Sequence, residues 1–290
     1  MSDGTRRRPL VVVTGASSGI GRLAARKLAE AGARVALVGR DPRRTSEAAL
    51  EAGGTPFVAD FDRLGDVRRL AQQLDELGPI DVLVNNAGGL VQHRELTVDG
   101  NERIFQANHL APFLLTNLLL AARHRRGDHR PFRVVSTASS AHRYGRLDLH
   151  DLTFARRPWR AGWAAYGAAK LATVLFVREL ARRAAADGLA GEVTAFAVHP
   201  GLVATGFVRD IPWLRLVARL TGGHYALGVE AGAAPLVRLA RQTPGALSGS
   251  YFDRMRAGRG LAARARGPAA DRLARELWRV SARLTGLDER

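Results

Sequence analysis

The chain has 290 residues, no cysteine and a formal net charge of +17 at neutral pH. This length is sufficient for a large buried core, and without an evident linker it predicts a single domain over residues 1–290. The absence of cysteine excludes disulfides, thiolate catalysis and cysteine-ligated metals, and the arginines are spread too evenly along the sequence to indicate specific nucleic-acid binding.

Short apolar or β-branched runs alternate with longer segments of helical periodicity along the chain. The runs that we expect to form strands are residues 10–13, 34–38, 55–59, 80–84, 133–136 and 193–198. This alternation is typical of repeated strand–helix units and predicts the α/β class. We expect a Rossmann-like, doubly wound parallel sheet of about seven strands with helices on both faces. The last helix would begin at Pro268 and end at Gly286.

The first expected strand leads directly into a glycine-rich sequence, Thr14 to Gly21, which opens the first helix. Glycines permit a tight turn and a close approach to a pyrophosphate, while the start of the helix supplies N–H donors. The order of strand, glycine turn and helix therefore predicts a dinucleotide site. The candidate binding residues in this turn are Gly15, Ser17, Ser18, Gly19, Ile20 and Gly21.

The end of the second expected strand discriminates between the two nicotinamide dinucleotides. An acidic side chain at this position holds the ribose hydroxyls of NAD(H), whereas a basic one accommodates the 2′-phosphate of NADP(H). The sequence reads Arg40 followed by Asp41, with Arg43 and Arg44 close behind. We predict a preference for NADP(H), with NAD(H) as the alternative because Asp41 is adjacent.

The most apolar stretch of the chain runs from His109 to Ala122 and is interrupted by Thr116 and Asn117. It is shorter than the ~18 residues needed to span a bilayer, and we interpret it as a buried helix. The apolar run after the basic residues 6–8 is likewise too short for a signal peptide. These features predict a cytoplasmic protein without a transmembrane segment.

Lysine is rare in this chain, because Lys27 and Lys170 are the only lysines among 44 basic residues. Lys170 stands four positions after Tyr166, and on a helix such positions share one face, so the phenol and the ammonium would point into the same space. An arginine would not serve equally there, because its guanidinium is a planar, diffuse cation. The spacing favours a functional pair over two unrelated surface side chains.

Further motifs follow the expected strands in a fixed order. They are Asp60-Phe61 after the third strand, Asn85-Asn86-Ala87-Gly88 after the fourth, Asn108 in a helix, Ser139 after the fifth, and Pro200-Gly201 with Thr205 after the sixth. Together with the glycine turn and the Tyr166 and Lys170 pair, this arrangement resembles the short-chain dehydrogenase/reductase family over nearly the whole chain. The sequences Asn108-His-Leu and Ser139-Ser-Ala-His142 are similar to its branch of retinol dehydrogenases and carbonyl reductases, which includes bacterial anthracycline side-chain ketoreductases.

The resemblance implies a role for each matching residue. Tyr166 would exchange the proton at the substrate oxygen, and Lys170 would stabilise its phenolate and hydrogen-bond the nicotinamide ribose. Ser139 would polarise the substrate carbonyl, with Ser140 as the alternative because both follow the same strand. Asn108 would hold a water in the proton path from Lys170. The other implied cofactor contacts are Asp60, Phe61, Asn86, Ala87, Gly88, Pro200, Gly201, Val203 and Thr205.

The resemblance also implies a lid over the substrate at about residues 205–228, where bulky apolar side chains alternate with arginines. Phe207 and Trp213 would line its underside, with Ser139 and Tyr166 at the reacting carbonyl. An apolar pocket with few polar anchors suits a bulky lipophilic ketone or aldehyde, such as a retinoid, steroid or aromatic polyketide. The alternative for this segment is a helix that packs on the core or lies on a membrane surface.

We therefore expect an NADPH-dependent carbonyl reductase, which the resemblance implies is a dimer or tetramer. The same residues would also serve an alcohol dehydrogenase working oxidatively. A noncatalytic cofactor-sensing protein and a charge-driven binder of nucleic acid or acidic membranes are alternatives from other classes. His142 and His199 lack further ligands at suitable spacing, so we expect no metal, with His199 packing at a strand end and His142 in a loop.

Overall fold

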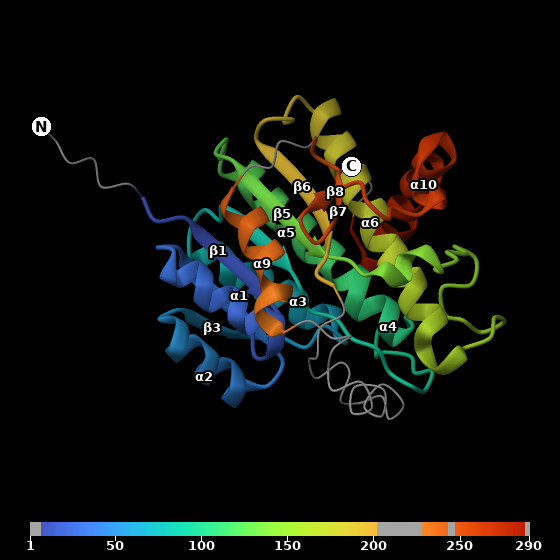
Figure 1. Ribbon diagram of the computed structural model, residues 1–290, viewed down its shortest axis with the longest axis horizontal. Coiled ribbons are helices and arrows are strands. Elements are labelled where there is room, and N and C mark those ends of the chain that lie inside the picture. The colour runs from blue at the N-terminus through green and yellow to red at the C-terminus, as the bar shows by residue number, and fades with distance from the viewer. Residues whose placement is uncertain (1–6, 202–227, 243–246, 288–290) are drawn as a thin grey trace, which may run out of the picture.

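The computed structural model describes residues 7–201, 228–242 and 247–287. Their strands form one eight-stranded sheet in the order β3-β2-β1-β4-β5-β6-β7-β8, parallel throughout except between β7 and β8 (Figure 1). The strands are β1 (Leu10–Thr14), β2 (Arg34–Gly39), β3 (Thr55–Val58), β4 (Val82–Asn85), β5 (Phe132–Thr137), β6 (Val193–His199), β7 (Tyr251–Asp253) and β8 (Arg256–Ala257). The predicted α/β class is confirmed, and the sheet exceeds the expected seven strands because the chain turns back after β7 to add the short β8.

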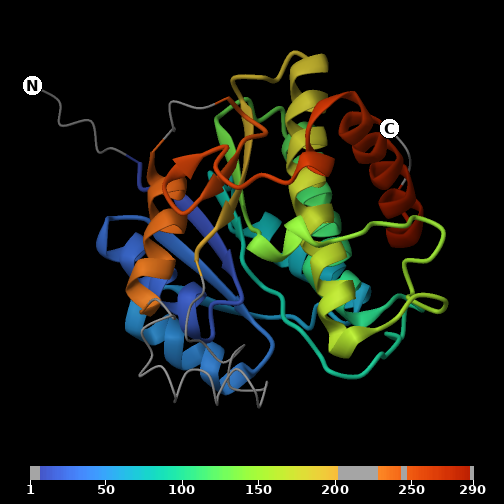
Figure 2. The same cartoon turned by 45° about the vertical axis from the view of Figure 1, so that its right-hand side comes forward.

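Helices pack on both faces of the sheet (Figure 2). One face is covered by α1 (Gly19–Glu30), α2 (Pro42–Ala52) and α9 (Val229–Arg241). The other is covered by α3 (Leu64–Glu76), α5 (Ala111–Arg125) and α6 (Trp163–Ala186), with α10 (Gly267–Thr285) packed against α6. Shorter helical segments are α4 (Arg103–Phe105), η1 (Gln106–Leu110), η2 (Ser140–Arg143), η3 (Arg160–Gly162) and η4 (Ala263–Ala265).

The first strand shows why the sheet is buried on both sides. Val11 and Val13 belong to the apolar cluster beneath α1 and α2, whereas Leu10 and Val12 belong to the cluster on the opposite face. Successive side chains of a strand point to opposite faces, so an uninterrupted apolar run suits a parallel strand covered by helices on both sides.

The segment Arg103–Arg125, which comprises α4, η1 and α5, is long and apolar enough to cross a membrane by length and composition alone. However, 72% of its apolar window is buried within the protein. Leu110, Leu114 and Leu115 are fully buried in the core beside β4 and α6. The interpretation of this stretch as a buried helix is confirmed.

The strand order places a binding site at the carboxyl edge of the sheet. β1 pairs with β2 on one side and with β4 on the other, so the connections from β1 and from β4 run in opposite directions. Ligands of open parallel sheets bind at this kind of switch point, outside the carboxyl ends of the strands. The polar motifs recognised in the sequence lie at these ends.

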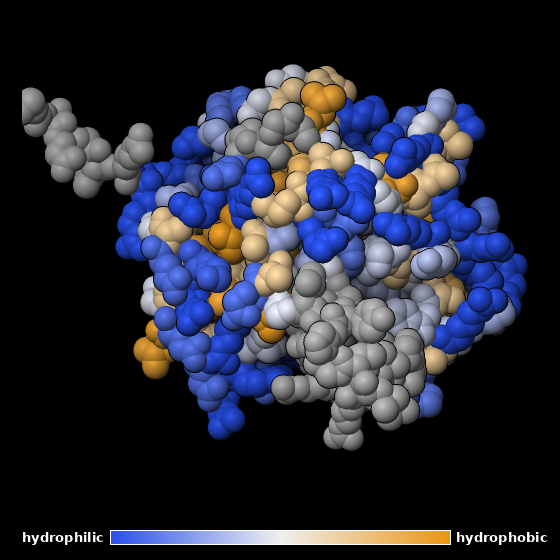
Figure 3. All heavy atoms as spheres, viewed as in Figure 1, coloured by the Kyte–Doolittle hydropathy of each residue, from blue (hydrophilic) through white to orange (hydrophobic). Residues whose placement is uncertain are grey.

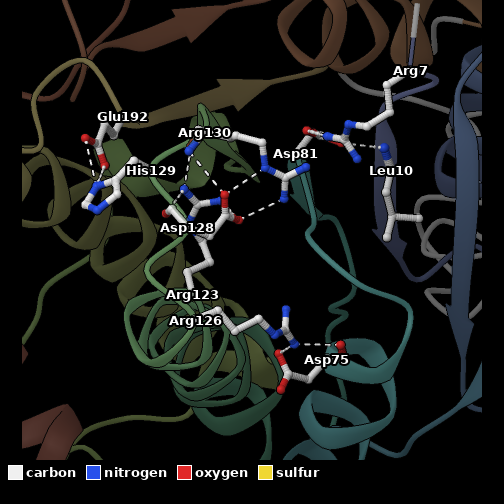
Figure 4. A network of polar contacts seen from close by, with 10 residues as sticks. All are labelled: Arg7, Leu10, Asp75, Asp81, Arg123, Arg126, Asp128, His129, Arg130 and Glu192. Atoms are coloured by element: carbon white, nitrogen blue, oxygen red, sulfur yellow. Dashed lines mark hydrogen bonds and ion pairs between the residues drawn. The ribbon is translucent and has the colours of Figure 1, made fainter. Parts of the chain in front are cut away.

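The opposite, amino-terminal edge carries a network of ion pairs (Figure 4). Asp128 accepts from Arg123 at 2.9 Å and from Arg130 at 2.7 Å, and the Asp128 and Arg123 side chains are both only 7% exposed. Asp81 pairs with Arg7 and accepts from the Leu10 N–H at 2.6 Å. The network joins the segments that precede β1, β4 and β5, on the side of the sheet away from the switch point.

On the face drawn in Figure 3, the hydrophilic residues do not form a single continuous band. Strongly hydrophilic side chains are scattered over the whole outline of this face and alternate with apolar patches.

Candidate active site

The glycine turn joins the end of β1 to the start of α1. Gly15 has φ +65° and Gly19 has φ +55°, a left-handed backbone that other residues rarely adopt. Ser18 is the N-cap of α1 but forms no side-chain cap, and the first turn of α1 contains no acidic residue. Within the described residues, neither the N-cap nor an acidic side chain of the first turn accepts from the first N–H groups of α1, and a diphosphate would match them in charge and in hydrogen bonding.

Close packing connects this turn to the loop after β4. A Cβ atom on Gly21 would lie 2.3 Å from Gly15 O and 2.6 Å from Asn86 Nδ2. Asn86 Nδ2 donates to Thr14 O at 3.1 Å, and the N–H groups of Asn86 and Ala87 each donate to Thr14 Oγ1 at 3.0 Å. The absence of side chains at the glycines leaves a backbone cradle, which these bonds to Thr14 hold in place, and the N–H groups at the start of α1 would meet the diphosphate of a bound dinucleotide.

Arg40 and Asp41 follow β2 and have different environments. The Asp41 carboxylate accepts from the Arg44 N–H at 2.8 Å and so caps α2. The Arg40 side chain is 63% exposed and lies 3.7 Å from Asp62 Oδ2. The acidic residue of the pair is thus engaged by its own helix, while the guanidinium stands at the tip of the strand.

The motif after β3 organises a turn at the same edge of the sheet. Asp60 Oδ1 accepts from the Asp62 N–H at 3.1 Å, and the Asp60 N–H donates to Asp66 Oδ2 at 3.1 Å. Phe61 is buried, at 7% exposure, and its side chain belongs to the core under α3. Of the two predicted residues, the half-buried Asp60 is the one whose side chain is partly open to solvent.

Asn108 lies in η1, a five-residue π-helix at the start of the long apolar segment. Its Nδ2 donates to Gly89 O and to Ile104 O, each at 2.8 Å, and a Cβ atom on Gly88 would lie 2.3 Å from its Oδ1. Asn108 therefore holds the loop after β4 in place. Within the described ranges, no hydrogen bond joins Asn108 to Lys170.

Tyr166 and Lys170 lie on the same side of α6, as the spacing predicted. Lys170 Nζ is 5.5 Å from the centroid of the Tyr166 ring. The lysine is 4% exposed, and its Nζ donates to Thr137 O, at the end of β5, over 3.0 Å. A hydrogen bond joins the side chains of Tyr166 and Ser139. The structure thus brings these three predicted residues together at the carboxyl end of β5.

Burial determines the protonation state of this pair. Desolvation raises the pKa of Tyr166 to about 12, and the hydrogen bond with Ser139 acts in the opposite direction. Desolvation also lowers the pKa of Lys170 to about 8, because burial penalises the ammonium. At neutral pH, Tyr166 therefore retains its proton and Lys170 retains its charge.

Ser139 and Ser140 differ in their contacts. Ser139 has an extended backbone, at φ −151° and ψ 155°, and its Oγ accepts from the Ala141 N–H at 3.2 Å as the cap of η2. Ser139 is also the serine bonded to Tyr166, whereas Ser140 is the first residue of η2. The geometry favours Ser139 over Ser140 as the residue that meets the substrate oxygen.

The predicted residues after β6 are only partly described. Pro200 follows β6 directly and is buried, and Gly201 has φ +97°. Val203, Thr205, Phe207 and Trp213 lie outside the described residues, as does nearly all of the proposed lid at 205–228.

Three residues near the pair were missed by sequence reasoning. Thr137 contributes the backbone oxygen that anchors Lys170, and a backbone role leaves no signature in residue type. Trp163 packs edge-on to Tyr166, with ring centroids 6.0 Å apart, and its position three residues earlier on the same helix was the available signal. The third is His142: the expectation of a loop there is wrong, because the residue is fully buried in η2.

His199, by contrast, ends β6 as a half-buried residue, in agreement with the expected packing role. Its pKa is lowered to about 4 by burial. In the described part of the chain, no group of three or more histidine, aspartate or glutamate side chains is arranged to hold a metal ion.

Comparison with known proteins gives one consistent family. The family model described as short chain dehydrogenase matches residues 9–150. A Streptomyces sp. (strain C5) protein proposed to be the daunorubicin C-13 ketoreductase DnrU is 40% identical over 294 residues, which cover 95% of this chain and 92% of that protein. Mouse retinol dehydrogenase 12 is 36% identical, with 96% and 86% of the two chains covered.

Solved structures agree with these sequence relatives. A protein of uncharacterised function from Mycobacterium paratuberculosis superimposes with a TM-score of 0.76 at 34% identity, covering 97% of this chain and 94% of that one. The RhlG/NADP complex of Pseudomonas aeruginosa superimposes with a TM-score of 0.67 at 27% identity, covering 87% and 96%.

Proposed function

The chain belongs to the short-chain dehydrogenase/reductase family, in its retinol dehydrogenase branch, and on that premise we propose that it reduces bulky lipophilic ketones or aldehydes with NADPH. Membership makes it an oxidoreductase that acts on CH–OH or C=O groups with a nicotinamide cofactor. The observation that carries the proposal is the Tyr166 hydroxyl, which is bonded to Ser139 and lies near the buried ammonium of Lys170.

The residues of the chain divide the work of carbonyl reduction. A bound nicotinamide cofactor would supply the hydride. Ser139, held by its cap contact with Ala141, would donate a hydrogen bond to the carbonyl oxygen and so stabilise the negative charge that develops there. Tyr166 would donate its proton to the same oxygen, and its raised pKa ensures that the proton is present at neutral pH.

Lys170 would make that proton transfer less costly. When Tyr166 gives up its proton, a phenolate remains in a largely desolvated site, and a cation nearby lowers its free energy. The hydrogen bond from Lys170 to Thr137 O keeps the ammonium beside the ring. The Asn108 amide supports the neighbouring loop, and we retain its predicted role in holding a water as part of this proposal.

The cofactor preference rests on the end of β2. Because Asp41 is engaged in capping α2, it competes poorly for ribose hydroxyls, whereas the exposed Arg40 is available to a 2′-phosphate. The glycine turn and the loop of Asn86 to Gly88 would hold the rest of the cofactor. NAD(H) use would be expected only with lower efficiency.

The substrate class is inferred from relatives and composition. One relative is named for ketone reduction on daunorubicin, an aromatic polyketide, and another for a retinoid alcohol. The bulky apolar residues of 205–228 suit a lipophilic molecule. We also retain the cytoplasmic location as a prediction. A dimer or tetramer is a further prediction, and size-exclusion chromatography with light scattering would test this oligomeric state.

Oxidation of an alcohol is a second candidate, because several relatives are named as retinol dehydrogenases. The same tyrosine would then accept the proton. Initial rates in both directions, with retinal and NADPH or with retinol and NADP⁺, distinguish which direction the protein supports better.

The decisive experiment replaces Tyr166 by Phe. We expect reduction of all-trans-retinal, a ketosteroid and daunorubicin by NADPH to be measurable in the wild type and to fall by at least about 100-fold in the variant, because the proton donor is lost. NADPH affinity, measured by fluorescence titration, should remain unchanged. Tyr144→Phe is the matched control, since Tyr144 is 84% exposed and should be dispensable. Turnover retained by Tyr166→Phe would refute the assignment.

A further inference from the structure

His142 is held by both of its ring nitrogens. Nδ1 lies 2.6 Å from Ser139 O, and Nε2 lies 3.1 Å from the backbone nitrogen of Ala262. A backbone N–H can only donate, so Nε2 must be the unprotonated acceptor and Nδ1 must carry the hydrogen. The two neighbours therefore select one neutral tautomer, in which Nδ1–H donates to the carbonyl of Ser139.

This contact acts on the residue that meets the substrate. Ser139 is held at its Oγ by the Ala141 N–H and by Tyr166, and its carbonyl oxygen accepts from both the backbone N–H and the ring of His142. The serine thus has fixed contacts on its side chain and on its backbone. The bond with Tyr166 connects it to α6, and the ring of His142 connects it to Ala262, which lies 120 residues beyond the histidine.

Residues 260–264 are hydrogen-bonded to η2 and to the residues just after it, and η2 packs against α6. Arg143 Nε donates to Gly260 O at 2.8 Å, and Arg264 donates to Gly145 O at 2.7 Å. A Cβ atom on Gly145 would lie only 2.1 Å from Gly167 O, so the backbones of the two segments touch next to Tyr166. The Tyr251 ring lies 4.8 Å from the imidazole, and His199 on β6 is close enough to interact with it electrostatically.

We propose that His142 is a positioning residue: the Ala262 N–H selects its neutral tautomer, and the Nδ1–H of that tautomer holds the carbonyl of Ser139 and thereby sets the serine against Tyr166. This inference rests on the proposed function, because the consequence of misplacing Ser139 is a slower reduction. Neither ring nitrogen is free to contact substrate or cofactor, so His142 acts through Ser139. The charged groups nearest the ring are Arg143 on η2 and Asp253 on β7.

Two amide substitutions separate the two hydrogen bonds. His142→Asn retains an amide at the position of Nδ1 and can still donate to Ser139 O, whereas His142→Gln retains one at the position of Nε2 and can still accept from Ala262. We expect kcat for all-trans-retinal or daunorubicin to fall on the order of 10- to 100-fold in His142→Gln and much less in His142→Asn. NADPH affinity and KM should change little in both.

The control is Arg143→Met, which removes a neighbouring bond to the same segment without touching Ser139. It should lower the melting temperature slightly and leave kcat unchanged. A merely structural role for His142 would make both amide variants lose activity in parallel with their melting temperatures. Equal kcat in His142→Asn and His142→Gln, at a temperature where both are folded, would overturn the inference.

A readout without substrate keeps this test separate from the proposed function. In protein labelled with ¹⁵N-histidine, the His142 resonances should report the Nδ1–H tautomer between about pH 6 and 9. An Nε2–H tautomer or a charged ring would contradict the inference even if no carbonyl were reduced. Conversely, wild-type protein that shows the expected tautomer but reduces no carbonyl would contradict the proposed function alone.

Discussion

Burial of the Lys170 ammonium costs free energy of folding, and its position favours a chemical role for this residue. Lys170 is 4% exposed, and among the residues that the structure describes it makes one hydrogen bond, to a backbone oxygen, and lies beside a tyrosine rather than a carboxylate. An uncompensated ammonium in such a site opposes folding. Residues of this kind are retained at sites where function rather than stability sets the sequence.

Replacement of Lys170 by Met should therefore separate stability from activity. Because burial lowers the pKa of Lys170 to about 8, the unfolded chain binds this proton more tightly, and the destabilising contribution is fully present below about pH 8 and absent above about pH 10.4. We expect Lys170→Met to be about 1–2 kcal/mol more stable than the wild type at pH 7, with the difference shrinking towards pH 10.

Urea denaturation of the cofactor-free protein at pH 7 and pH 10 measures this difference. Reduction of retinal should fall by at least about 100-fold in the same variant. A Met variant that is less stable at pH 7 would show that the ammonium has stabilising partners beyond Thr137 O.

The proposed preference for NADPH depends on the side chain of Arg40. Arg40→Ala should lower kcat/KM for NADPH on the order of 10- to 100-fold, the value of a charge-assisted hydrogen bond, and leave the value for NADH unchanged. Arg43→Ala is the matched control, because Arg43 is 84% exposed and pairs with Glu47 on the same helix. Equal losses with both cofactors would place the 2′-phosphate elsewhere.

At the scale of elements, the junction of β1 and α1 requires a glycine at position 21 because neighbouring atoms leave no room for a side chain there. Gly21 has ordinary helical backbone, so its identity follows from the approach of Gly15 O and Asn86 to its Cα and not from its own φ. The turn, the helix start and the loop after β4 therefore form one unit. Any side chain at this position must separate α1 from both of its neighbours.

A pair of alanine substitutions tests this explanation. Gly21→Ala places a Cβ atom 2.3 Å from Gly15 O and should destabilise the fold by about 2 kcal/mol or more while weakening NADPH binding. Gly65→Ala lies in α3 with nothing within 4 Å of its Cβ and should instead stabilise by up to about 1 kcal/mol. Thermal unfolding and NADPH titration of both variants provide the measurement. Equal effects would mean that the cost at residue 21 does not come from close packing.

At the scale of the whole molecule, the two edges of the sheet have separate tasks. The carboxyl edge holds the Tyr166, Lys170 and Ser139 site, whereas the amino edge holds the ion pairs around Asp128. The Asp128 carboxylate, bonded to Arg130 and close to Arg123, has its pKa lowered to about 2. Changes at the amino edge should therefore alter stability without altering turnover.

Asp128→Asn tests that separation. Loss of the carboxylate leaves Arg123, itself 7% exposed, without its charge partner, so we expect a loss of about 2–4 kcal/mol at pH 7 and an unchanged kcat. Because the folded-state pKa is lowered, the stabilisation is present above about pH 4 and is lost as the pH falls towards 2. The difference in urea midpoint between the wild type and the variant should therefore decrease as the pH falls from about 4 towards 2. A reduced kcat would show that the two edges are coupled.

The chain order of short apolar runs and glycines was sufficient to predict the parallel sheet, the glycine turn and the shared face of Tyr166 and Lys170. These features depend on the periodicity of a strand or helix and on neighbours within a few residues, so the sequence contains them directly. The two-residue strand β8 and the π-helix around Asn108 have no such local signal, because each is formed by the way the chain packs on distant elements.

The partners of the site residues could be known only from the folded chain. Lys170 is hydrogen-bonded to Thr137 O, which is 33 residues away in the sequence, and His142 is hydrogen-bonded to the Ala262 N–H, which is 120 residues away. The spacing of residues along a sequence does not predict such pairs, because contacts between distant segments depend on how the helices and strands pack together. The sequence around His142 consequently predicts only a loop. Its contacts with both Ser139 and the C-terminal segment depend on the packing of β6, β7 and α6 in the folded chain.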